Sequence, residues 1–153
     1  MSRIDNNTFS HRMLLKEADP DAFNAMLRFD EYLGKSSLTK AHAELIKIRV
    51  SQINGCSYCI DKHIKDAVSY GEEHRRIHLL SVWHEVPFFT IEERAILALC
   101  EEVTMISDHG VSDEVYNNAI TVLGQQYTIV VLMAIISMNA WNRIGITTKR
   151  VPE

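Results

Sequence analysis

The chain has 153 residues, of which 46% are apolar and 24% are charged, and its formal net charge is −4. These proportions are typical of a globular protein and exclude a disordered chain. The negative charge excludes the basic surface of a nucleic-acid-binding protein. Six glycines and three prolines are too few for the frequent turns of an all-β fold. The length corresponds to one domain, which we expect to span residues 1–153 with a core at about 19–146.

Apolar residues recur at helical spacing along almost the whole chain, and no alternating strand pattern of useful length is present. Capping residues mark helix starts: Asp19 precedes Pro20, and Thr90 is followed three residues later by Glu93. Glycines mark helix ends, and Gly145 is expected to close the last helix. We therefore predict an all-α domain of about seven helices, at about residues 20–34, 38–54, 56–70, 72–85, 91–106, 112–124 and 128–144.

The first residues, Met1–Asn7, are polar and lack the apolar stretch of a secretory signal. The longest apolar run, Ile129–Met138, is shorter than the roughly 20 residues that span a bilayer, so we expect a core helix there. Three cysteines without a secretory signal indicate a reducing compartment. We therefore expect a cytoplasmic protein with neither a membrane nor a nucleic acid as partner.

Cys56, Cys59 and His63 follow one another at intervals of three and four residues. On a helix this spacing places both thiols and the imidazole on one inward-facing stripe, where neighbours have Cβ atoms about 5–6 Å apart. Cys59 can therefore contact Cys56 on one side and His63 on the other. Because Cys56 lies at the start of the helix, we expect it to be the more exposed of the two thiols.

Glu44 is expected to join this group from the preceding helix. If the two helices form an antiparallel pair about Asn54 and Gly55, Glu44 and His63 lie at nearly the same distance from the turn. A carboxylate beside an imidazole fixes the tautomer of the ring and raises its basicity. The residues Glu44, His63, Cys59 and Cys56 therefore form a plausible proton relay to a dithiol.

The chemistry of a close dithiol fits this arrangement. The thiolate is the nucleophile, and both the start of a helix and a neighbouring histidine lower the pKa of a cysteine from about 8.5. Attack on a peroxide leaves a sulfenic acid, and an adjacent thiol condenses with the sulfenic acid to form a disulfide.

The spacing Glu44, eleven residues, Cys56, two residues, Cys59, three residues, His63 resembles the motif of the AhpD-like alkylhydroperoxidase and carboxymuconolactone decarboxylase superfamily. The segments 92–99 and 138–143 also look like those of single-domain members, and the resemblance covers about residues 23–146. It implies an all-α fold and obligate homo-oligomers, often hexamers of paired subunits. It also implies peroxide reduction by a peroxiredoxin-type enzyme of antioxidant defence, without a cofactor or a metal.

By the same resemblance, Cys59 is the peroxidatic cysteine, Cys56 the resolving cysteine, and His63 and Glu44 the relay. The partners implied are a peroxide substrate and a dithiol or lipoyl-type protein reductant. One position departs from the family pattern, because Tyr58 stands where the well-studied alkylhydroperoxidase has a histidine. The decarboxylase activity in the superfamily name uses other residues and is not predicted.

Other interpretations of the same residues remain open. The two cysteines and His63 are potential zinc ligands with Glu44 as the fourth, or they form inert core packing. In that case the protein is a non-catalytic helical oligomer that binds zinc or senses oxidation. The remaining candidates are expected to be structural: Cys100 as a core residue, Tyr58 and Trp83 as packing residues, and His74, His78 and His84 as surface or interface residues.

Overall fold

The computed structural model describes residues 10–152, and that part of the chain is all-helical, as predicted. The polar segment Met1–Asn7 lies outside the described residues. The helices are α1 (Leu15–Ala18), α2 (Pro20–Lys35), α3 (Lys40–Asn54), α4 (Ser57–Ser69), α5 (His74–Leu79), a 3-10 helix (Leu80–Glu85), α6 (Ile91–Thr104), α7 (Ile106–His109), α8 (Asp113–Leu123) and α9 (Gln125–Thr147).

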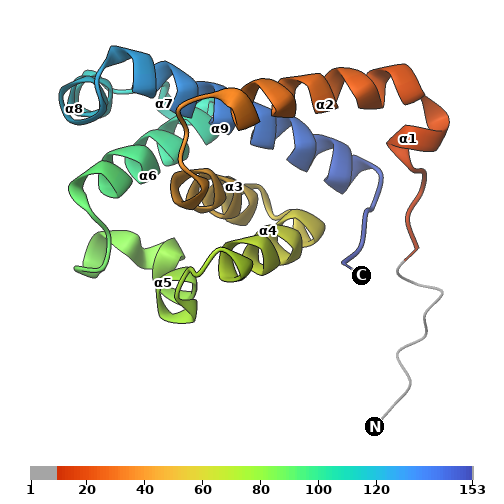
Figure 1. Cartoon of the computed structure of the whole chain (residues 1–153), viewed down its shortest axis with the longest axis horizontal. Coiled ribbons are helices and arrows are strands. Elements are labelled where there is room, and N and C mark those ends of the chain that lie inside the picture. Colours follow the sequence, from red (N-terminus) through yellow and green to blue (C-terminus); the bar gives the residue numbers. More distant parts are fainter. Residues whose placement is uncertain (1–9, 153) are drawn as a thin grey trace, which may run out of the picture.

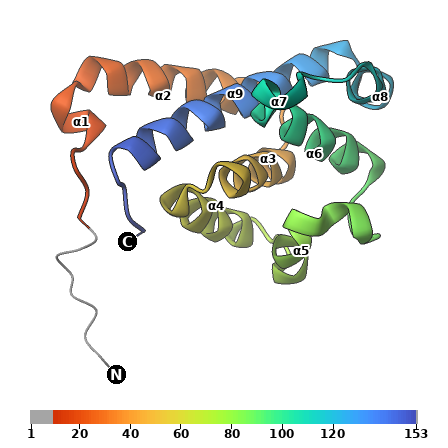
Figure 2. The ribbon, with the colours of Figure 1, turned by 180° about the vertical axis from the view of Figure 1, so that it is seen from behind.

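Helix α3 lies at the centre of the fold, between α4, α6 and α9 (Figures 1 and 2). Its side chains point into two apolar clusters on opposite faces. Ile46 and Val50 pack with residues of α6, α8 and α9, whereas Leu45 and Ile48 pack with residues of α4, α5 and the 3-10 helix. These four side chains are almost completely buried, so the position of α3 is fixed from both sides.

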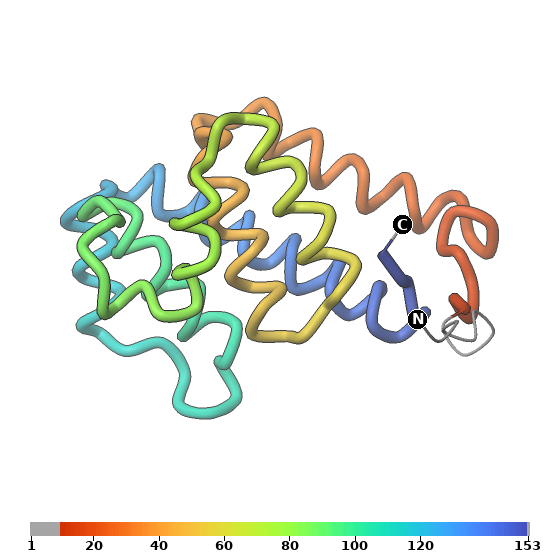
Figure 3. Tube along the Cα trace, turned by 90° about the horizontal axis from the view of Figure 1, so that it is seen from below, coloured from red at the N-terminus to blue at the C-terminus, as the bar shows by residue number. Residues whose placement is uncertain are grey.

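Helices α3 and α4 run antiparallel and side by side, as the view from below shows (Figure 3). Gly55 makes the turn between them with a φ of 74°, a left-handed conformation that side-chain-bearing residues rarely adopt.

The predicted helix starts at Asp19 and Thr90 are confirmed. Asp19 accepts hydrogen bonds from the first turn of α2, and Thr90 and Glu93 form a reciprocal capping box at α6.

The segment predicted as one helix over residues 72–85 is instead a short α-helix followed by a 3-10 helix. Val82 has non-helical angles, with a φ of −123°. The guanidinium of Arg94, on α6, donates hydrogen bonds to the carbonyls of Trp83, His84 and Val86. A side chain of the next helix therefore satisfies carbonyl groups that are left free where the 3-10 helix ends.

The last helix, α9, is longer than predicted, and Gly145 does not end it. The helix ends instead at Thr147, and Lys149, just after the cap residue Thr148, has a φ of 53°. The amide of Arg150 donates to the carbonyl of Gly145, and the amide of Lys149 donates to that of Ile146, which is the hydrogen-bond pattern of a Schellman motif. Gly145 instead lies beside the sulfurs of Cys56 and Cys59.

Helix α9 is long and apolar enough to cross a bilayer by length and composition alone. In the fold, however, α2, α3, α6 and α8 pack along it. Four of its residues are buried in the cluster that α3 forms with α6, α8 and α9, which we call the central cluster: Val131, Ala134, Ile135 and Met138. This confirms the prediction of a core helix, and the core role accounts for the apolar composition of this face of α9.

A buried polar network joins α3 to α9. Asn142 is fully buried, and its amide donates to Ser51 Oγ at 2.9 Å. Its carbonyl oxygen accepts a hydrogen bond from Asn54 Nδ2 at 3.0 Å. Because each of these buried groups has a partner, the network can be retained at little cost.

We expect Asn142→Ala to lower the free energy of unfolding by about 1–3 kcal/mol, because it removes the partner of the fully buried Ser51 hydroxyl, whereas Asn54 keeps its bond to Asn139. Urea unfolding measures the change. The control is Asn118→Ala, which makes the same substitution at an exposed position of α8. A loss no larger than that of the control would contradict the structural role of the network.

Candidate active site: a buried dithiol

A disulfide joins Cys56 and Cys59, whose Cα atoms are 5.4 Å apart. Cys56 is the N-cap residue of α4 with an extended backbone, and Cys59 lies in the first turn. Both are buried, with exposures of 2% and 5%. The expectation that Cys56 is the more exposed thiol is therefore wrong, because helix α9 covers the start of α4.

Gly145 provides the contact between α9 and the sulfurs. A Cβ atom at this position would lie 3.2 Å from Cys56 Sγ and 3.7 Å from Cys59 Sγ. The first of these distances is shorter than a normal carbon–sulfur contact, so a side chain at this position would require the sulfur or the helix to shift by a few tenths of an ångström. The sequence pattern missed this role, because a glycine near the end of an apolar helix indicates a helix terminus.

The segment that follows α9 covers Tyr58, the residue that departs from the family pattern. The guanidinium of Arg150 lies 4.5 Å from the centre of the Tyr58 ring, a cation–π contact. The ring is half-buried and packs against the central cluster. This agrees with the prediction that Tyr58 is a packing residue.

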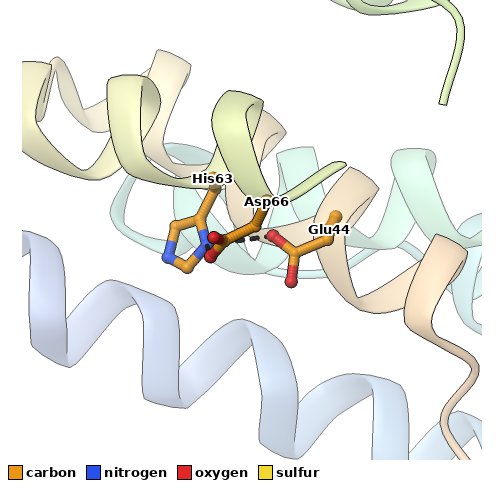
Figure 4. A group of neighbouring side chains, drawn as sticks. All are labelled: Glu44, His63 and Asp66. Carbon is orange, nitrogen blue, oxygen red and sulfur yellow. Dashed lines mark hydrogen bonds and ion pairs between the residues drawn. The ribbon is translucent and has the colours of Figure 1, made fainter. Parts of the chain in front are cut away.

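The structure brings Glu44 and His63 together, as the antiparallel arrangement predicts (Figure 4). Nδ1 of His63 is 2.9 Å from Glu44 Oε2, and Lys47 Nζ is 2.8 Å from Oε1 of the same carboxylate. Burial raises the pKa of Glu44, but the hydrogen bonds from His63 and Lys47 outweigh burial, so the pKa lies below its usual value. Glu44 is therefore ionised at neutral pH.

The charge on Glu44 determines which ring nitrogen of His63 carries the hydrogen. An ionised carboxylate only accepts hydrogen bonds, so Nδ1 of His63 must donate to it. In the neutral imidazole, Nε2 is then left as the basic nitrogen. In the disulfide form, neither sulfur makes a hydrogen bond with His63 within the described part of the chain. Proton transfer between His63 and Cys59 therefore stays a prediction about the reduced form.

Asp66 is a neighbour of His63 that the sequence reasoning did not identify. Its Oδ2 atom is 3.6 Å from Nδ1 of His63 and 2.6 Å from Lys62 Nζ. The side chains of His63 and Asp66 both come from α4 and point toward Glu44 on α3 (Figure 4). The interval of three residues was a usable signal, because residues at i and i+3 lie on one face of a helix.

The other candidates lie outside this group. Cys100 is fully buried in the core, as predicted, and burial raises the pKa of its thiol well above the usual range. His74 and His78 are exposed neighbours on α5. Trp83 is buried, as expected of a packing residue, and both Trp83 and His84 bond to Glu101.

These features define an all-helical protein with a buried dithiol and a carboxylate–imidazole pair beside it. The chain belongs to the carboxymuconolactone decarboxylase family, whose model matches residues 20–102, and it has the AhpD-like fold. The resemblance seen in the sequence is therefore confirmed.

Three comparisons illustrate the relationship. The chain is 39% identical to the uncharacterized protein YdfG of Bacillus subtilis over 90% of this chain and 93% of YdfG. A protein of unknown function from Agrobacterium tumefaciens, for which an antioxidant defence role of the AhpD type has been suggested, is 33% identical. Its structure has a TM-score of 0.91 over 94% of this chain and 99% of that one. The debrominase Bmp8 is 16% identical with a TM-score of 0.77 over 90% of this chain and 74% of Bmp8, a likeness of fold alone.

We expect Gly145→Ala to lower the melting temperature of the oxidised protein more than that of the reduced protein. The added methyl group meets Cys56 Sγ, which the disulfide holds in place, whereas a free thiol can rotate away. Gly34→Ala in α2 is the matched control, because it gives the same gain in helix propensity and no atom lies within 4 Å of its new Cβ. Equal effects of the two substitutions on the oxidised protein would contradict the contact.

Proposed function

We propose that this protein is a thiol-dependent peroxidase of the alkylhydroperoxidase type, which reduces peroxides through Cys56 and Cys59. The observation that carries the proposal is the geometry of the site: a disulfide at the start of α4, with an ionised Glu44 bonded to a buried His63 one turn further along the helix. The family membership and the likeness to AhpD-type proteins support the same reaction class.

The reaction begins with both cysteines reduced. Nε2 of His63 takes the proton of the Cys59 thiol, and Glu44 stabilises the resulting imidazolium. The Cys59 thiolate attacks one oxygen of the peroxide bond. That bond breaks, the other oxygen leaves with a proton as an alcohol or water, and Cys59 becomes a sulfenic acid.

Cys56 completes the cycle. Its sulfur attacks the sulfur of the Cys59 sulfenic acid, water leaves, and the disulfide seen in the structure forms. A dithiol or lipoyl-type protein reductant then returns two electrons and two protons and becomes oxidised itself. The roles of the two cysteines follow from their spacing, since only Cys59 has His63 four residues further along the helix.

The alternative from the sequence is a non-catalytic oligomer that binds zinc through the cysteines and His63, with Glu44 as the fourth ligand. Two of its four supposed ligands are used differently in the structure, because the sulfurs of Cys56 and Cys59 are bonded to each other. Metal content and thiol titration of the purified protein test this alternative directly.

We also propose that the protein assembles as a homo-oligomer. Ile129 and Ile136 are seven residues apart on α9 and are 50% and 42% exposed, so they form an outward apolar face. An apolar groove next to Ile129, lined in part by Ile120 and Leu132, continues this face between α8 and α9. Light scattering that shows a monodisperse 17.5 kDa monomer at micromolar concentration would contradict assembly.

We expect Cys59→Ser to abolish trapping of a sulfenic acid after mild peroxide treatment. Cys56→Ser should instead leave a trappable sulfenic acid at Cys59 that persists and over-oxidises, because no resolving thiol remains. Peptide mass mapping with a sulfenic acid reagent measures both, and Cys100 should stay reduced because burial raises the pKa of its thiol and so disfavours the reactive thiolate. A sulfenic acid that forms on Cys56 at the wild-type rate in Cys59→Ser would reverse the assigned roles.

We expect Glu44→Gln to slow sulfenic acid formation on Cys59 by about 10²–10⁴-fold, the usual contribution of a general base. The glutamine has the same shape but cannot stabilise the imidazolium. Stopped-flow measurement of peroxide consumption gives the rate, and Glu73→Gln, at an exposed position before α5, is the control. A folded Glu44→Gln variant with the rate of the control would exclude the relay.

A further inference from the structure

The group formed by Glu44, His63 and Asp66 has a second property that the proposed reaction does not use. One atom from each residue, the imidazole Nδ1 and a carboxylate oxygen from each acid, lies within 4.8 Å of the others. Nδ1 is 2.9 Å from the oxygen of Glu44 and 3.6 Å from the oxygen of Asp66. Ligands bound to tetrahedral zinc at about 2.0–2.2 Å stand about 3.3–3.6 Å apart, so the Asp66 distance already fits and the Glu44 distance must lengthen slightly.

From this convergence we propose that Glu44, His63 and Asp66 bind a divalent transition-metal ion such as Zn²⁺, with water as the fourth ligand. One imidazole and two carboxylates are ligand types that zinc accepts in open sites. The ligands come from α3 and α4, which pack along their lengths, and two of the three side chains are buried. Their positions are therefore set before an ion binds.

Two lysines lie beside the carboxylates, and neither prevents binding. Lys47 bonds to Oε1 of Glu44, so Oε2 remains directed at the imidazole. Lys62 pairs with Asp66 in an i, i+4 ion pair whose lysine side chain is 50% exposed, and exposed pairs of this kind contribute little to stability. The ion therefore displaces Lys62 at low cost.

An access route is also present. A pocket of about 350 Å³ opens beside Glu44 and is lined by Lys40, Tyr70 and Ala67, the residue next to Asp66. A hydrated ion can approach Glu44 from this side without passing the dithiol.

A metal ion on Nδ1 would reverse the tautomer of His63. Without the ion, Nδ1 carries the hydrogen and Nε2 is basic. With the ion bound to Nδ1, the neutral ring keeps one hydrogen, which must then lie on Nε2, and Nε2 can no longer accept a proton from Cys59. The ion would thus inhibit the dithiol chemistry, a consequence that rests on the proposed function, whereas the site itself does not.

The test uses oxidised, tag-free protein, in which the disulfide prevents the cysteines from binding zinc. His78→Gln is included in every sample, since His74 and His78 are an exposed i, i+4 pair that can also hold an ion. Calorimetric titration with Zn²⁺ should show one ion per chain, and Co²⁺ should give the visible spectrum of a tetrahedral complex. No binding to the oxidised protein would overturn the proposal.

Asp66→Asn should weaken the binding of Zn²⁺ at least tenfold, because loss of even an outer-shell partner costs about 10–100-fold in metal affinity. Asp61→Asn is the matched control, because Asp61 also lies on α4 and pairs with Lys65 as Asp66 pairs with Lys62. Equal affinities of the two variants would overturn the assignment of the ligands.

In the reduced protein, Zn²⁺ should slow the formation of the Cys59 sulfenic acid, and the Asp66→Asn variant should resist this inhibition. Oxidised protein that binds Zn²⁺ through Asp66 confirms the site even if the reduced protein forms no sulfenic acid at all. That second result would refute the peroxidase proposal alone, so the two failures are distinguishable.

Discussion

The hydrogen bond between His63 and Glu44 lies at the contact between two antiparallel helices, of which α3 is buried on both faces. A buried carboxylate is costly unless hydrogen bonds satisfy it, and here His63 and Lys47 do so. The same bond holds the His63 face of α4 against α3, together with the packing of Cys59 and Ala67 in the core. Since Cys59 lies one turn before His63 on this helix, the bond that stabilises Glu44 also directs the thiol inward.

The end of α9 and the residues that follow it lie against the dithiol and its neighbour Tyr58. Gly145 lies against both sulfurs, and Arg150 lies over the ring of Tyr58. None of these three residues belongs to the Glu–Cys–Cys–His motif. The motif therefore supplies the dithiol, and residues outside the motif form its surroundings. The debrominase Bmp8 has a similar fold. A fold alone does not determine the substrate.

His63 belongs both to the proposed proton relay and to the group formed by Glu44, His63 and Asp66. Nδ1 of His63 faces Glu44 and Asp66, and each carboxylate has its own lysine. The hydrogen on Nδ1 is therefore directed at these carboxylates. The opposite nitrogen is basic only while that position carries the proton, so one imidazole couples the two sides of the site.

The sequence by itself determined the all-helical class, the helix starts at Asp19 and Thr90, and the meeting of Glu44 with His63. Each of these depends on capping residues, helical periodicity or equal distance from a turn, which are local properties of the chain. Tertiary structure alone decided that Arg94 caps the end of the 3-10 helix and that Gly145 lies against the sulfurs. It also decided the burial of Cys56. These features arise from contacts between different helices of the fold, which the local pattern within one helix does not reveal.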